Sequence, residues 1–147
     1  MTLENLLALQ RLQQVTPDKA AIARLVAAAS RNLADAQLQA LSADNRFDAA
    51  YKCLLQCAMV GLQANGYRTS TSQPGHHQTA LQALPKSMGI EPERLVVLDT
   101  LRRKRNLSDY DGEPVSEAML ATCLEEAHSL LEHTLGWLHE HHPELVD

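Results

Sequence analysis

The sequence predicts an all-α protein, an up-and-down bundle of about five helices that forms a single domain over residues 1–147. Apolar residues make up 45% of the chain and aromatic residues only 3%, so Ala and Leu, which favour helices, fill most of the interior. Apolar residues also recur three, four and seven positions apart over long segments, which is the period of an amphipathic helix. The length is sufficient for one domain with a sizeable core.

The first part of the chain predicts two helices. A short N-terminal helix is expected within residues 1–15, because Leu3, Leu6 and Leu7 share one face. Thr16 as N-cap and Pro17 at the first helical position predict a second helix that continues to about Leu41. Its apolar face comprises Ile22, Leu25, Val26, Ala29, Leu33 and Ala36.

A third helix is expected to begin near Asp44 or Asn45 and to end at Gly66, which supplies a left-handed cap. Its buried stripe comprises Phe47, Ala50, Tyr51, Leu54, Ala58 and Leu62. A loop is predicted over residues 67–75, followed by a short helix that contains Leu81 and stops around Pro85 or Gly89.

The next helix is expected to carry the site. It opens after Pro92, and Leu98 and Leu101 share one arc with Arg102 and Arg105, so two cations continue an apolar stripe. The polar run over residues 106–112 is interpreted as a turn that places the arginines near a helix end. The last helix, with Ser116 as its cap, has the most regular apolar spacing, at Leu120, Cys123, Leu124, Ala127, Leu130, Leu131, Leu135 and Leu138.

Charge is segregated along the chain. The net charge is −5, yet all 13 Lys and Arg residues lie in residues 1–105, and four of them are residues 102–105. The global field therefore does not favour nucleic acid, whereas a compact basic spot could bind phosphate locally. No segment has the roughly 20 apolar residues of a membrane span, and three cysteines are an odd count, so we expect a cytoplasmic protein without a disulfide framework or membrane contact.

Arg102 and Arg105 are candidate ligands for phosphate, because guanidinium groups match phosphate oxygens, and Tyr110 could donate a proton nearby. The alternative is a helix C-terminus stabilised by cations, with Tyr110 packed in the turn. His76 and His77 could reach this cluster. No cofactor is expected, and no metal site, since adjacent histidines point to different faces and no other ligand has matching spacing.

The run Arg-Arg-Lys-Arg-Asn-Leu-Ser-Asp-Tyr-Asp at residues 102–111, placed before the last long helix, resembles the HEPN superfamily, whose signature is Arg, a polar residue and a His a few residues later. Three upstream segments resemble the same family: residues 46–51, 66–68 and 75–77. The resemblance covers residues 46–138. Arg105 matches the motif arginine and Asn106 its polar neighbour, while Tyr110 stands in the place of the histidine.

This resemblance implies a helical bundle that forms a homodimer with the motifs of both chains in one cleft. It implies binding of RNA or a nucleotide through Arg102 and Arg105, and it makes Arg105, Asn106 and Tyr110 the candidate catalytic residues of a metal-independent ribonuclease. It also implies a toxin-antitoxin component with a nucleotidyltransferase partner. Tyr110 is a poor general base near neutrality, because a phenol with the usual pKa of about 10 remains protonated there. The alternative is a non-catalytic module for protein interaction or dimerisation, with no nucleic-acid ligand.

Overall fold

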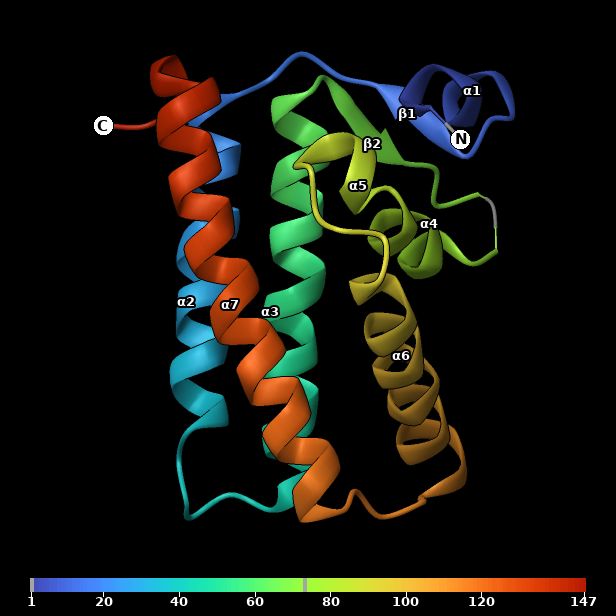
Figure 1. The fold of residues 1–147 in the computed structure, drawn as a ribbon, viewed down its shortest axis with the longest axis vertical. Coiled ribbons are helices and arrows are strands. Elements are labelled where there is room, and N and C mark those ends of the chain that lie inside the picture. Colours follow the sequence, from blue (N-terminus) through green and yellow to red (C-terminus); the bar gives the residue numbers. More distant parts are fainter. Residues whose placement is uncertain (1, 73) are drawn as a thin grey trace.

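The computed structural model describes residues 2–72 and 74–147 and confirms an all-α, up-and-down helical bundle. Four long helices run alternately in opposite directions (Figure 1): α2 (Lys19–Ala36), α3 (Ala43–Ala64), α6 (Arg94–Asp111) and α7 (Glu117–His141). Shorter elements accompany them: α1 (Leu3–Ala8), α4 (His76–Gln82), α5 (Leu84–Ser87) and the 3₁₀ turn η1 (Pro143–Leu145). Gln73, which belongs to the predicted 67–75 loop, lies outside the described residues.

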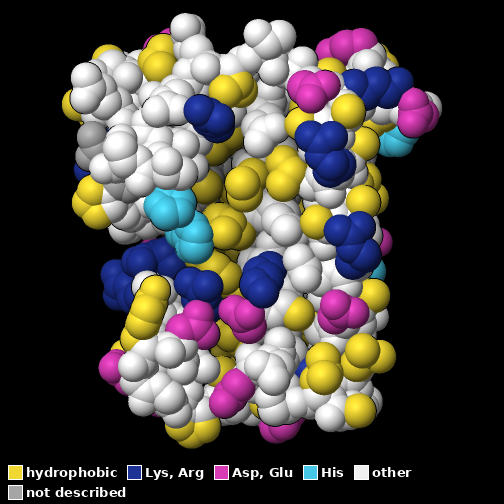
Figure 2. Space-filling model, turned by 180° about the vertical axis from the view of Figure 1, so that it is seen from behind, with side chains coloured by type: hydrophobic (Ala, Val, Ile, Leu, Met, Phe, Trp, Pro, Cys, Tyr) yellow, Lys and Arg dark blue, Asp and Glu magenta, His cyan; other side chains and the backbone are white. Residues whose placement is uncertain are grey.

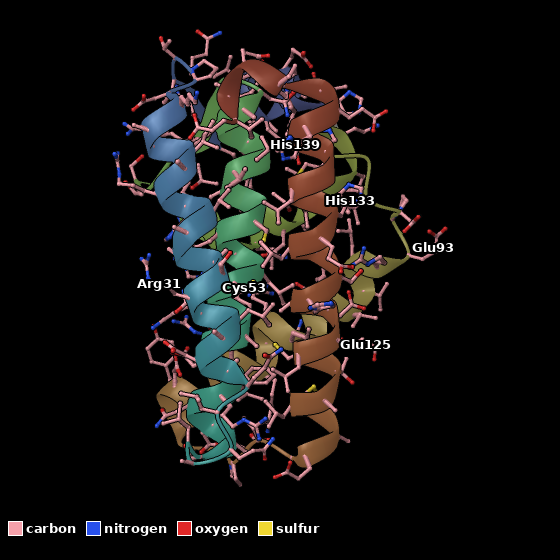
Figure 3. The ribbon with its side chains drawn as sticks, turned by 90° about the vertical axis from the view of Figure 1, so that its left-hand side faces the viewer. Arg31, Cys53, Glu93, Glu125, His133 and His139 are labelled. Carbon is pink, nitrogen blue, oxygen red and sulfur yellow. The ribbon has the colours of Figure 1, made fainter. Side chains whose placement is uncertain are left out.

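Helix α3 is the centre of the bundle. It packs against α2, α7, α6 and α4, and from the side α2, α3 and α7 lie alongside one another (Figure 3). The six residues of its predicted stripe are all at most 1% exposed, which confirms the stripe: Phe47, Ala50, Tyr51, Leu54, Ala58 and Leu62. Cys53, Cys57 and Cys123 are free and buried between the helices, as small apolar side chains would be.

Helix α2 is shorter than predicted at both ends. It begins after Asp18, whose carboxylate accepts a hydrogen bond from Ala20 N, rather than after Thr16. It ends at Ala36 rather than near Leu41, because the Arg46 Nε–H donates to Ala36 O at 2.8 Å and closes the helix end. Leu38 and Leu41 are exposed in the connection to α3.

The N-terminal segment corrects the prediction of one helix within residues 1–15. Helix α1 stops after six residues, and Gln10 takes a φ of 62° that a helix cannot continue. Strand β1 (Leu12–Gln14) follows and pairs antiparallel with β2 (Tyr67–Thr69), within the segment predicted as a loop. Pairing satisfies the backbone of both segments and places Leu12 in the core at 2% exposure. Three-residue strands leave no periodic signal in the sequence.

Helix α6 is longer than predicted. The polar run over residues 106–112 was expected to be a turn, but the helix continues to Asp111, and only Gly112, with a φ of 68°, closes it. Arg102 and Arg105 therefore lie within the helix rather than beside a turn. Leu98 and Leu101 are 1% and 0% exposed, so the chain's own core covers the apolar part of this arc.

Specific polar contacts fix α6 against the bundle. The Arg94 guanidinium donates two hydrogen bonds to Glu126 of α7, at 2.8 and 3.2 Å. In the loop after α6, Val115 N donates to Asp44 Oδ1 of α3 at 2.8 Å. At the other end, His133 points from α7 towards the loop before α6, where its Nε2 lies 2.7 Å from Met88 O (Figure 3). Within the described residues, no helix has the length and apolar content needed to cross a bilayer.

We predict that Leu130→Ala, on the buried face of α7, lowers the free energy of unfolding by about 2–5 kcal/mol, because it removes apolar contacts and leaves a cavity. Leu130 is 0% exposed, whereas Leu135 on the same helix is 38% exposed, so Leu135→Ala is the matched control. Urea titration followed by circular dichroism measures both. Equal, small effects of the two substitutions would contradict the assignment of α7 to the core.

Candidate functional site

A pocket of about 200 Å³ lies where the start of α4 meets the middle and end of α6. Helix α4 packs against both α3 and α6. The pocket brings together all six site residues predicted from the sequence, with Gly75 and Gln78 completing its lining: His76, His77, Arg102, Arg105, Asn106 and Tyr110. In Figure 2, Lys and Arg side chains gather at one edge of the molecule, directly beside histidine side chains.

The two histidines come from a segment some thirty residues before the arginines. Gly75, with a φ of 78°, turns the chain into α4 and places His76 and His77 in its first turn. Their rings pack edge to face, with centroids 4.6 Å apart. His77 also lies over Tyr51 of α3, with ring centroids 6.3 Å apart. The short helix α4 therefore supplies imidazole groups that the motif on α6 lacks.

Carboxylates hold both pocket arginines by one edge. Arg102 Nε donates to Asp99 Oδ1 at 3.0 Å. Arg105 Nε lies 2.9 Å from Asp109 Oδ2 on the same helix and 3.6 Å from Asp48 Oδ1 of α3. The terminal Nη groups of Arg102 and Arg105 donate no hydrogen bond to any described residue, so the fork that matches a phosphate remains free.

Beneath the pocket lies a group of buried polar atoms that have no hydrogen-bond partner. Four buried side-chain polar atoms of the described residues lack a hydrogen-bond partner, and three of them belong to this place: Asp48 Oδ1, Tyr51 Oη and Arg105 Nε. Arg105 Nε is within ion-pair distance of two carboxylates, yet its N–H is not aligned with either. Its Cζ lies 5.6 Å from the centre of the Tyr51 ring. Unsatisfied buried groups are costly, so their concentration at one place makes it a candidate functional site.

The electrostatics of the pocket favour neutral His77. Burial lowers the pKa of His77 below its ordinary value, and the charges of His76, Arg105 and Arg102 lower it further. Burial raises the pKa of Tyr51 to about 12, although Arg105 and Arg102 act in the opposite direction. At neutral pH the pocket therefore combines two guanidinium cations with an unprotonated imidazole, a pairing suited to an anion whose neighbouring hydroxyl loses a proton.

Three participants were not predicted as site residues. Asp109 was missed because residues 106–112 were interpreted as a turn; in a continuous helix it lies four residues after Arg105. Tyr51 was predicted as core and is buried, but it also forms the floor under Arg105. Asp48 comes from another helix, and no spacing in the sequence connects it with Arg105. Asp99, which lies three residues before Arg102 and four before Arg103, is 3.0 Å from the Nε of each.

Tyr110 differs from its expected environment. The alternative to a functional role was packing in a turn, but Tyr110 lies in the last turn of α6 and is 81% exposed at the rim of the pocket.

Among the described residues, no group of three or more His, Cys, Asp or Glu side chains could hold a metal ion. Comparisons of the chain with protein-family models, with curated proteins and with solved structures found no match.

The lowered pKa of His77 predicts a pH-dependent stability. The unfolded chain binds a proton at His77 below about pH 6.5, whereas the folded chain binds it only at lower pH. The free energy of unfolding therefore decreases as the pH falls from about 6.5 towards the lower pKa of His77 in the folded chain, because the unfolded chain gains a proton first. We predict that His77→Gln makes stability less dependent on pH in urea titrations, relative to His139→Gln on an exposed face of α7. Identical pH profiles for the two variants would contradict this environment.

Proposed function

We propose that this chain is a HEPN-like RNA-binding domain whose pocket takes a phosphate group of RNA or of a nucleotide. The single observation that carries the proposal is the pair of pocket arginines, each with a carboxylate within 3.0 Å of its Nε and with Nη groups that donate to no described residue. Guanidinium forks bind phosphate oxygens by two parallel hydrogen bonds, and their positions here are fixed before the ligand arrives. Asn106 lines the same pocket and supplies an amide for a sugar hydroxyl or a base edge.

The internal carboxylates remove most of the long-range attraction for an anion. Asp48, Asp99 and Asp109 balance the charges of Arg102, Arg103 and Arg105, so the site has no excess positive charge. Binding then depends on the geometry of the Nη groups rather than on a broad basic surface, in keeping with the net charge of −5. A ligand with a localised phosphate fits such a site better than a long duplex, whose affinity comes from many scattered contacts.

Metal-independent RNA cleavage is the second candidate, and the position of His77 favours it. In such a reaction the 2′ oxygen attacks phosphorus while a base takes its proton, the bond from phosphorus to the 5′ oxygen breaks, and the 5′ oxygen takes a proton from water and leaves as a hydroxyl group. His77 lies in the pocket beside both arginines and is unprotonated at neutral pH because its pKa is lowered. Arg105 would stabilise the charge that develops on the phosphate. Tyr110 stands at the motif position of the catalytic histidine. In this proposal the histidines of α4 perform the role of that histidine.

We further propose that the protein forms a homodimer through the N-terminal half of α6. Leu98 and Leu101 cannot make this contact, because they are buried within the chain. Val96 is 72% exposed and Leu9 is 54% exposed, and Leu9 borders a groove of about 610 Å³ between α1, α4 and α6. Arg11 and Asp99 line the same groove, so two copies could pair opposite charges around an apolar centre.

The resemblance to the HEPN superfamily alone underlies two further expectations, a role in a toxin-antitoxin pair and a nucleotidyltransferase partner. A pocket with oriented arginines and histidines is consistent with an RNA-directed toxin, whereas a pure interaction module would not need it. RNA binding that depends on the pocket therefore separates the proposed function from the non-catalytic alternative.

We predict that Arg105→Gln weakens binding of a short, fluorescently labelled single-stranded RNA by at least about tenfold, because charge-assisted hydrogen bonds worth about 1.5–3 kcal/mol are lost. Fluorescence anisotropy at fixed salt measures the affinity, and circular dichroism verifies folding. Arg103→Gln is the matched control, since Arg103 is two residues away, 72% exposed at its side chain and outside the pocket. Equal losses for both variants would indicate unspecific charge attraction and contradict the site.

If the domain is a ribonuclease, cleavage of the same RNA in the presence of EDTA should yield 2′,3′-cyclic phosphate ends. His77→Gln should then slow cleavage by about 10²–10⁴-fold while leaving RNA bound, because a general base contributes a factor of this size. Denaturing gels measure the rate. Cleavage that His77→Gln leaves unchanged would exclude His77 as the base, and binding without cleavage would assign the domain to binding alone.

The dimer proposal predicts that light scattering at micromolar concentration reports twice the chain mass and that Val96→Asp shifts the protein to monomer, because the charge would be buried at the interface. Leu38→Asp provides the control, as Leu38 is also exposed, at 53%, but lies in the connection after α2. A monomeric wild-type protein, or a dimer unaffected by Val96→Asp, would contradict this interface.

A further inference from the structure

Tyr110 is the most exposed of the large apolar or aromatic side chains, at 81%, and it lines the pocket. No described aromatic ring packs against it, unlike Tyr51, whose ring meets His77. Its position in the last turn of α6 fixes the backbone that carries the ring at the rim of the pocket. An exposed aromatic ring beside a phosphate pocket is the arrangement by which proteins stack unpaired bases.

The size of the pocket shows that a nucleotide must extend beyond it. Pockets that enclose drug-sized ligands have volumes of about 300–1,000 Å³, and this pocket has about 200 Å³. It can therefore hold the phosphate and part of the sugar, but the base has to lie at the rim. Of the aromatic rings that line this pocket, Tyr110 is the most exposed, whereas His76 and His77 are partly buried and pack against each other.

The order of side chains along α6 fits one nucleotide. Arg102, Asn106 and Tyr110 are spaced four residues apart and follow one another on successive turns of one face. Arg105 and Tyr110 are separated by roughly 7.5 Å of helix rise. A phosphate at the arginines, a sugar near Asn106 and a base at Tyr110 thus follow the direction of the helix.

We propose that Tyr110 is a stacking platform for an unpaired base, so that the ligand of this pocket is single-stranded RNA rather than a duplex. The inference rests on the proposed function, because the phosphate must first be held by Arg102 and Arg105. A paired base is covered on both faces by its neighbours, whereas an unpaired base next to the bound phosphate can place one face on the ring. Tyr110 is then a binding residue, and its hydroxyl is not required.

The test uses fluorescence anisotropy to compare three kinds of labelled RNA of the same length. These are a single strand, a series of the same strand with one abasic position moved along it, and the duplex. The single strand is expected to bind most tightly, and one abasic position to weaken binding about 5- to 150-fold. Tyr110→Leu keeps an apolar side chain but has no aromatic face, so it should weaken binding of the intact single strand by the same factor. It should not weaken binding of the abasic strand any further. Tyr110→Phe should restore the affinity.

Several outcomes would overturn the inference. Equal affinity for single strand and duplex, or an effect of Tyr110→Leu that persists in full with the abasic strand, would show that the ring does not stack on a base. Loss of affinity by Tyr110→Leu together with conversion to monomers in light scattering would assign Tyr110 to the dimer contact instead. If RNA binds in an Arg105-dependent way but ignores Tyr110, stacking fails alone; if Arg105→Gln has no effect, the proposed function fails as well.

Discussion

The half-buried guanidinium of Arg105 is the constraint on which the site depends. It lies over the Tyr51 ring and is held at Nε between Asp109 of its own helix and Asp48 of α3. Because a buried cation is costly without nearby anions, these carboxylates are needed for the fold as well as for the site. They lie beside the Nε edge of the guanidinium, while the Arg105 side chain lines the pocket. Stability and ligand recognition therefore use the same group.

The bundle supplies the second half of the site through α4. This helix has seven residues, yet it packs between α3 and α6 and brings His76 and His77 to the arginines. The burial and the neighbouring cations that lower the pKa of His77 arise from this packing. The arginines of α6, which contains no histidine, are thereby combined with an imidazole from elsewhere in the chain, which links the helical architecture directly to the proposed RNA chemistry.

The sequence predicted the parts of this structure that depend on regular patterns. The stripe of α3, the cap at Ser116 and five of the pocket residues were identified from spacing and residue type, whereas Asn106 was identified only through the resemblance to the HEPN superfamily. The prediction of a turn over residues 106–112 was wrong, because the polar residues after Arg105 are typical of a turn. The helix instead continues to Asp111, which brings Asp109 next to Arg105. The sequence also could not reveal Asp48 as a partner, nor the strands at Leu12 and Thr69, because those contacts join distant segments through tertiary packing alone.

The central claim is that the Nη edges of Arg102 and Arg105 hold a phosphate of RNA. A crystal structure of the protein with a short single-stranded RNA tests it most directly, since it locates the phosphate rather than the loss of affinity. We expect phosphate oxygens within about 2.7–2.9 Å of the Nη atoms of these arginines, with the Nε contacts to Asp99 and Asp109 retained. RNA bound on another surface, with the pocket arginines still facing no phosphate, would contradict it.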